Sequence, residues 1–147
     1  MRYARRVLPG FFMLLPLVNL AGVSEAVAKV KADQSADLAR VAIMEFVNET
    51  QQAEYEWVER SLPDAINNSM QARFEFIRQD DAKVAAAAAK YRRVAGEYQL
   101  ADADKIAKES QTDILIYGNF RTNENQDQLL FKAIIYNAQG KKVIGIV

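Results

Sequence analysis

The sequence predicts an α/β fold of the α+β kind, in which one mixed sheet has two main helices packed on it. Short β-branched runs and helical stripes follow one another in the order β-α-β-α-α-β-β-β. Helices between the early strands favour parallel pairing, whereas the last strands lie close enough in the sequence for antiparallel hairpins. At 147 residues the chain has the length of one domain. We expect this domain to span residues 41–147.

The first strand is expected at Val41–Val47, and Asn48-Glu49-Thr50 ends it. The run is short, rich in β-branched residues and apolar at nearly every position. A strand of this composition is typical of a sheet that is covered on both faces.

Residues 53–72 change to a helical period. Their apolar residues recur at spacings of three and four, as in an amphipathic helix; they are Tyr55, Val58, Leu62, Ile66 and Met70. Pro63 lies inside this stripe and would remove one helical hydrogen bond. We therefore expect a short helical piece and then a restart, with Ser61 as the cap and Asp64 completing a capping box.

Residues 74–78 alternate apolar and polar side chains, which predicts a second strand. Asp80 and Asp81 follow and can cap a helix over residues 82–95, whose alanine run is a strong helix former. A further short helix is expected after that, with Asp102 as its cap.

Three strands close the domain, at residues 113–118, 129–136 and 143–147. The polar loop 122–127 suits a hairpin connection, and the turn before the last strand contains Gly140, which is free to take positive φ. The last strand has no polar residue after its apolar end. Such an edge is either completed by a partner or continued in a longer natural chain, and we favour the longer chain.

Residues 1–28 are predicted to be a signal peptide, and residues 29–40 a flexible leader. A positive n-region precedes an apolar run, and Ala26-Val27-Ala28 has the A-x-A form of a signal-peptidase site. A membrane span is the competing interpretation, but proline, glycine and asparagine interrupt the ~20 apolar residues that a span needs. Arg5-Arg6 permits a twin-arginine route, which we weigh below the general one. We expect an exported, periplasmic or outer-membrane-associated protein with no membrane span after cleavage.

The charge balance argues against a nucleic-acid partner. The whole chain has 19 basic and 19 acidic residues, and removal of three arginines and one glutamate with the signal peptide leaves 16 and 18. No run of more than two like charges remains, so the chain lacks a basic footprint for nucleic acid or anionic lipid. Because it has no cysteine, neither disulfides nor a lipid on an N-terminal cysteine can hold it.

The residue types exclude most catalytic chemistry, and we predict that the protein is not an enzyme. Without histidine or cysteine, the Ser-His-Asp, Cys-His and histidine-metal arrangements are impossible. Glycine-rich phosphate-binding motifs are also missing, so we expect no cofactor. The close acidic pairs are Asp80-Asp81 and Asp102/Asp104. Helix capping accounts for them better than acid–base or metal chemistry does, so we expect no metal site.

Two surfaces are candidates for partner binding. Tyr55 and Trp57 point about 200° apart on a helix, and Tyr55 lies on the apolar stripe whereas Trp57 lies off it beside Glu59. An exposed tryptophan anchors interfaces, and covering the sheet edge is an equal alternative for it. The second candidate is the last strand, with Ile144 and Ile146. On the alanine-rich helix, the basic group of Lys90, Arg92 and Arg93 is expected to be a solvated face and not an anion site.

Residues 41–49 resemble the opening strand of a bacterial envelope domain group that includes the N-terminal domain of TolB, the curli secretion protein CsgG and the flagellar protein FlgO. Residues 103–108 and 113–118 are similar to its helix and glycine-ended strand, and residues 130–140 to its next strand and turn. The resemblance implies a non-enzymatic module that contacts other envelope proteins. The chain departs from CsgG in lacking a lipidation cysteine and membrane-spanning hairpins, which argues against a pore.

The predicted function is therefore a non-enzymatic protein-binding or assembly module of the cell envelope. Its partners would be envelope proteins or further copies of itself. Two alternatives stay open at this point. One is a structural subunit of a flagellar or secretion ring, whose last strand completes a neighbour's sheet, and the other is a carboxylate-dependent enzyme.

Overall fold

A six-stranded mixed sheet carries the fold of this chain. A computed structural model describes residues 38–94 and 97–147, so the predicted signal peptide and most of the leader lie outside the described residues. The strands are β1 (Arg40–Ile43), β2 (Val47–Asn48), β3 (Ile77–Arg78), β4 (Ile114–Thr122), β5 (Leu129–Asn137) and β6 (Lys142–Ile146). The helices are the 3-10 turn η1 (Ala53–Tyr55), α2 (Glu56–Gln71), α3 (Asp81–Ala88) and α4 (Leu100–Ser110).

The strand order is β3-β1-β4-β5-β6, and β2 also pairs with β4. β1 is parallel to both of its neighbours, with Val41 opposite Arg78 on β3 and opposite Ile114 on β4. The strands β4, β5 and β6 form an antiparallel meander. This arrangement confirms the predicted mixed sheet.

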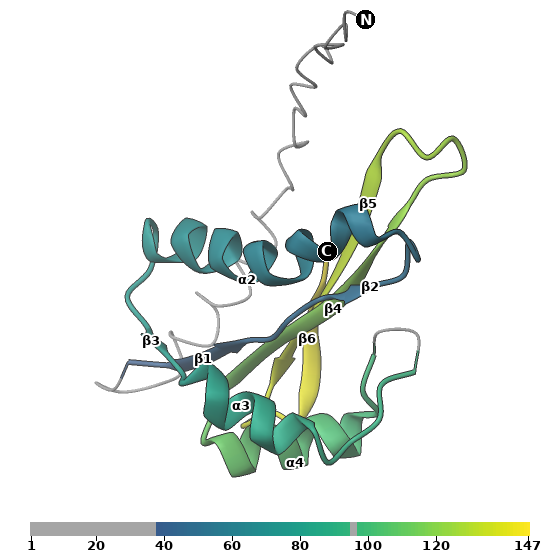
Figure 1. Cartoon of the computed structure of the whole chain (residues 1–147). Helices are drawn as coiled ribbons and strands as arrows, with labels where there is room; N and C mark the ends of the chain where they lie inside the picture. The colour runs from purple at the N-terminus through teal and green to yellow at the C-terminus, as the bar shows by residue number, and fades with distance from the viewer. Residues whose placement is uncertain (1–37, 95–96) are drawn as a thin grey trace, which may run out of the picture.

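The helices lie on opposite faces of the sheet, with α2 on one and both α3 and α4 on the other (Figure 1). Since side chains alternate along a strand, a strand can contribute side chains to the core on each face of the sheet. On β4, for example, Ile114 and Ile116 pack with Ile66 of α2, whereas Leu115 and Tyr117 pack with Ile106 of α4. The buried first strand was predicted to be covered on both faces, and it is.

The predicted first strand is split into β1 and β2. From Ile43 to Val47 the chain advances four residues, while the paired residues of β4 advance three, from Ile116 to Asn119. One extra residue is thus accommodated, as in a β-bulge, and Glu45 is turned outward. β1 also begins one residue earlier than predicted, and Ala39 before it is buried.

The predicted helix restart at Ser61 is wrong, because α2 runs without a break through Pro63. Proline in a helix interior costs one hydrogen bond and some strain, about 3 kcal/mol. The apolar face of α2 continues on both sides of Pro63, with Val58 before it and Ile66 and Met70 after it, all buried. Burial of this continuous stripe against the sheet outweighs the local preference to begin a new helix.

Other boundaries also differ from the prediction. Only Ile77 and Arg78 of the second strand are paired, and α3 ends at Ala88 instead of residue 95. Asp80 caps α3 as predicted, since its Oδ1 accepts the N–H of Ala82 at 2.9 Å. Asp102 is not a cap, because α4 begins earlier, at Leu100, and places Asp102 in its first turn.

The turn before β6 is built differently from the predicted one. Positive φ falls on Lys141, at 49°, and not on Gly140. The side chain of Asn137 shapes the turn, because its Oδ1 accepts the N–H groups of Gln139 and Gly140. Within residues 38–94 and 97–147, no helix has the length and apolar character that crossing a membrane requires.

Candidate binding site

Trp57 lies on the outer side of α2 with 51% of its surface exposed. It borders a hollow of about 510 Å³ that is lined by Glu56, Trp57, Arg60, Ser61 and Asp64. Tyr55, by contrast, is half-buried and packs against the core beneath α2. Tyr55 lies in η1, just before α2 begins, and faces the core, so Trp57 is the exposed one of the pair.

The other predicted binding residues do not join this surface. Glu59 is half-buried, and its Oε1 accepts the main-chain N–H of Asn48 at 3.1 Å, so that it ties α2 to β2. Ile144 is half-buried against the core on the α2 side of the sheet. Ile146, on β6, is 64% exposed and stands opposite Ile134 of β5. The binding role of all these residues stays a prediction.

A larger cleft of about 690 Å³ opens between α2 and α3, beside β1 and β3. It exists because β3 is only two residues long, so nothing from β3 covers the later part of β1. The cleft is lined mainly by apolar groups, which are Ile43, Met44, Pro63, Ala82, Val84, Ala85, Ala88, Ala89, Tyr91 and Tyr98. Its charged lining residues are Glu45, Arg60, Asp64, Arg78, Asp81 and Arg93.

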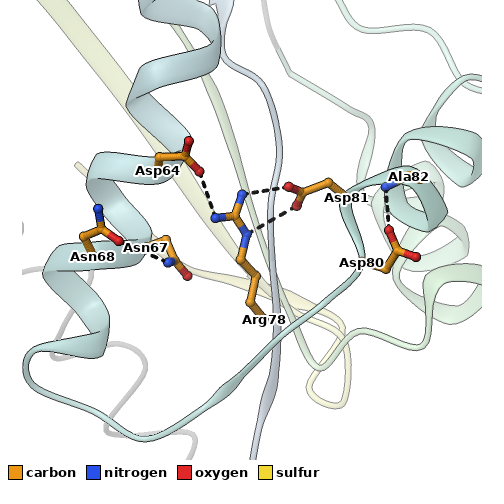
Figure 2. A network of polar contacts seen from close by, with 7 residues as sticks. All are labelled: Asp64, Asn67, Asn68, Arg78, Asp80, Asp81 and Ala82. Atoms are coloured by element: carbon orange, nitrogen blue, oxygen red, sulfur yellow. Dashed lines mark hydrogen bonds and ion pairs between the residues drawn. The ribbon is translucent and has the colours of Figure 1, made fainter.

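Arg78 joins the two helices that flank the cleft. Figure 2 shows its guanidinium between Asp64 of α2 and Asp81 of α3. Nη1 donates to Asp64 Oδ1 at 2.9 Å, while Nη2 and Nε donate to the two oxygens of Asp81 at 2.8 and 3.4 Å. Burial alone would lower the pKa of Arg78, but the hydrogen bonds and charges of both carboxylates outweigh it and raise the pKa. Arg78 is thus a structural cation.

Arg93 lies at another side of the cleft with a different set of partners. Its Nη1 donates to the carbonyl oxygen of Glu45 at 2.8 Å, and its guanidinium stacks over Tyr98, 4.8 Å from the ring centroid. Tyr98 in turn meets Tyr117 edge to face at 5.4 Å. No carboxylate among the described residues pairs with Arg93. The expectation of a solvated basic face is therefore wrong for Arg93, because the early end of α3 turns its side chain back to the sheet.

The hollow beside Trp57 and the cleft form one surface. Arg60 and Asp64, on successive turns of α2, line both of them. The exposed tryptophan therefore borders a hollow that shares two lining residues with the apolar cleft. Large concave sites with a few fixed polar groups are the usual form of binding pockets in proteins.

The acidic pairs have structural partners in this fold. Asp102 bonds Lys105 at 3.4 Å, and Asp104 bonds Lys108 at 2.7 Å and accepts the Tyr136 hydroxyl at 3.3 Å. The Lys108 hydrogen bond, against some desolvation, lowers the pKa of Asp104. In the described part of the chain, no group of three or more acidic side chains is placed to hold a metal ion.

Sequence reasoning found Trp57 but missed the cleft. Its lining comes from α2, α3, β1 and β3, and no short motif spans them. Arg78 gave one usable signal, since a lone arginine at the end of a short strand is followed by an acid three residues later. Asp64 is fourteen residues away from Arg78, and only the fold brings the two together.

No family model and no curated protein sequence matches the chain. Three solved structures share its fold. The C-terminal domain of LpoB from Salmonella enterica has a TM-score of 0.56 at 13% identity, covering 87% of this chain and 93% of that one. The same domain from Escherichia coli gives 0.55 at 12%, covering 86% and 93%. The NMR structure of E. coli LpoB gives 0.55 at 12%, covering 84% of this chain and 62% of LpoB.

These matches confirm the predicted fold class. At 12–13% identity they show a shared fold alone. TolB, CsgG and FlgO are not among the three, so the resemblance to those proteins stays a prediction.

Proposed function

We propose that this chain is a non-catalytic protein-binding module of the bacterial cell envelope, acting after export. The observation that carries the proposal is the half-exposed Trp57 beside the hollow that adjoins the apolar cleft. Its ring exposes a large apolar surface to water, and a partner that covers it gains the free energy of burying that surface.

The residue types of this surface favour a protein partner. Tryptophan and arginine are enriched among the residues that dominate binding energy at protein interfaces. Trp57 and Arg60 lie together at the hollow, and neither is needed to fill the core. Because the chain has no histidine or cysteine, this surface has little reactive chemistry to offer a small substrate.

The envelope location rests on sequence and fold together. Residues 1–28 have the pattern of an export signal. The resemblance to envelope proteins in residues 41–147 points to the same compartment. The shared fold with the LpoB domains supports a bacterial module of this size.

The test is capture of envelope proteins from a cross-linked bacterial extract by the immobilised chain and its Trp57→Ala variant. We expect a specific partner to be retained by the wild type and largely lost by the variant. The melting temperature of the variant should stay almost unchanged, since exposed substitutions typically cost within about 0.5 kcal/mol. Leu130→Ala is the matched control, because Leu130 is another exposed apolar residue, on β5, at 43% exposure.

Two results would contradict the proposal. One is equal capture by wild type and Trp57→Ala. The other is a large loss of stability in Trp57→Ala, comparable to that of Ile66→Ala in the same helix. Ile66 is only 2% exposed, and its truncation should cost about 2–5 kcal/mol.

Self-association through β6 is the second candidate function. Within the described residues β6 pairs with β5 alone, and Ile146 on it is 64% exposed. A ring or filament subunit would use such an edge to extend a neighbour's sheet. Sedimentation velocity decides between the candidates. A large oligomer that Ile146→Lys dissociates supports assembly, and a monomer at high concentration excludes it.

A further inference from the structure

We infer that the cleft between α2 and α3 takes an extended, acidic segment of a partner protein, which adds as a short strand to the side of β1 beyond the end of β3. This inference rests on the proposed protein-binding function and names the kind of segment that the site would recognise. Strand addition to a sheet edge is a common way of binding peptides.

The hydrogen bonds of β1 show which of its main-chain groups face the cleft. The carbonyl of Arg40 accepts the N–H of Asp113, and the N–H of Met44 donates to Ile116, so even-numbered residues bond toward β4. The carbonyls of Ala39 and Val41 accept from Ile77 and Gln79, so odd-numbered residues bond toward β3. Since the directions alternate along a strand, the N–H and C=O of Ile43 also point toward β3.

β3 stops before it reaches Ile43. Its pairing with β1 covers Arg40 and Val41, and the last bond between the two segments runs from Gln79 N–H to Val41 O. Ile43 itself lines the cleft. In the part of the chain that the structure describes, no strand continues the ladder along this side of β1. The cleft therefore offers a sheet edge at its base.

Arg93 marks the far end of this edge. It donates to the carbonyl of Glu45, the next odd-numbered residue after Ile43. The bulge between Ile43 and Val47 ends the regular alternation here, and the guanidinium of Arg93 limits how far an added strand could extend. The open part of the edge between Gln79 and Arg93 is short, so an added strand would bond mainly at Ile43 and lie between the two helices.

The charges of the lining favour an acidic segment. Arg78 already bonds two carboxylates, whereas neither Arg60 nor Arg93 bonds one among the described residues. A carboxylate on the bound segment would complement these two guanidinium groups. The lining also holds three acids: Asp64 and Asp81, which Arg78 bonds, and Glu45, whose carbonyl bonds Arg93. The acid of the segment should therefore lie toward Arg60.

The apolar lining gives room for a side chain of the segment. α3 and its C-cap contribute mostly alanines to the wall of the cleft, among them Ala82, Ala85 and Ala89. Alternate side chains of an added strand point to opposite sides. One set would pack on this alanine wall while the other points toward α2 and Arg60.

The test is selection from a displayed library of random peptides of about seven residues on the chain lacking residues 1–28, which retains every described element. We expect enriched peptides to carry an acid and apolar residues at alternate positions. N-methylation of a central amide in the best peptide should weaken binding about tenfold or more. NMR shifts on binding should include the amides of residues 43–45.

A matched pair of variants locates the site. Ala85→Trp fills the cleft, whereas Ala86→Trp places the same bulk on the neighbouring exposed position of α3, outside the lining. We expect Ala85→Trp to abolish peptide binding and Ala86→Trp to leave it intact, with equal melting temperatures. Arg60→Gln should weaken acidic peptides about tenfold and leave peptides with glutamine in place of the acid unchanged.

Several outcomes would overturn the inference. They are the enrichment of no peptide, binding that survives both N-methylation and Ala85→Trp, or enriched peptides without an acid. The protein-binding function is judged separately. If the partner captured from the extract is lost in Trp57→Ala but kept in Ala85→Trp, the function stands and the strand-addition mode fails.

Discussion

The guanidinium of Arg78 bonds both carboxylate oxygens of Asp81, with Nη2 to Oδ2 at 2.8 Å and Nε to Oδ1 at 3.4 Å. The last residue of β3 is thereby tied to the first residue of α3. Asp64 of α2 takes the remaining Nη1 (Figure 2). One side chain therefore links the two helices that flank the cleft.

Replacing Arg78 by lysine is expected to lower the free energy of unfolding by roughly 1 kcal/mol. Lysine keeps the charge but cannot bond two carboxylates in this planar geometry. The loss is limited because both aspartates are about two-thirds exposed and screened by water. Denaturant unfolding measures it, with Arg121→Lys on the exposed side of β4 as the control. Equal stabilities of the two variants would show that the network contributes nothing.

Gly118→Ala should be strongly destabilising, by roughly 3 kcal/mol. A Cβ at Gly118 would lie 1.8 Å from the main-chain oxygen of Lys132 and 2.8 Å from Cε1 of Phe46. Main-chain atoms of a paired strand cannot move away cheaply. Gly140→Ala is the control, because its nearest contact is the flexible end of Lys142 at 3.4 Å. Thermal unfolding that ranks the two variants equally would contradict the packing described for β4 and β5.

Stability is expected to fall at high pH because of two buried tyrosines. Burial raises the pKa of Tyr117 and of Tyr136 from 10.0 to about 12. Between pH 10 and pH 12 each of these tyrosines is deprotonated in the unfolded chain but still protonated in the folded chain. The stabilisation is therefore complete below pH 10 and is lost as the pH rises toward 12, by about 1.4 kcal/mol per pH unit for each tyrosine.

Tyr117→Phe tests this pH dependence, because it removes one of the two groups and should make the decline shallower. The measurement is the free energy of unfolding in denaturant at several alkaline pH values, together with the tyrosinate absorbance of the folded protein. A decline as steep as that of the wild type would show that Tyr117 titrates normally in the folded state.

Cleavage after Ala28 is expected when the chain is produced in a bacterium, so that the exported protein begins with Lys29. N-terminal sequencing and intact mass measure this directly. Ala28→Phe should block cleavage and leave the precursor in the membrane fraction, because the peptidase requires a small residue there. Ala32→Phe, beyond the expected site, should be processed normally. A wild-type protein that retains Met1 in the periplasm would contradict the predicted signal peptide.

Strands of the sheet could be predicted from the sequence where a run of apolar residues has the length and spacing of a buried strand. The apolar runs of β1 and β4 and the hairpin residues around 122–127 each have a local signature. The cap at Asp80 also needs no tertiary information. These elements account for the fold class, whereas the position of β1 between β3 and β4 was not predicted.

The path of α2 and the cleft could not be predicted, because both depend on contacts between distant segments. Pro63 is tolerated only because the sheet covers the apolar stripe on both sides of it. The cleft depends on the early end of α3 and on the shortness of β3. Trp57 was identified because it is a large residue off the apolar stripe, whereas Arg60 and Arg93 have no such local signal.

Because the sheet divides the interior into two core layers, β4 must pair with its neighbours in one register only. The odd and even halves of β1 and β4 fill different chambers, one under α2 and the other under α4. Deletion of a single residue early in β4 would send isoleucines sized for the first chamber into the second, and a tyrosine the other way. A substitution that restored the packing of one core layer would leave the other layer mispacked. Such a deletion should abolish the folded protein outright, even though every remaining side chain is native.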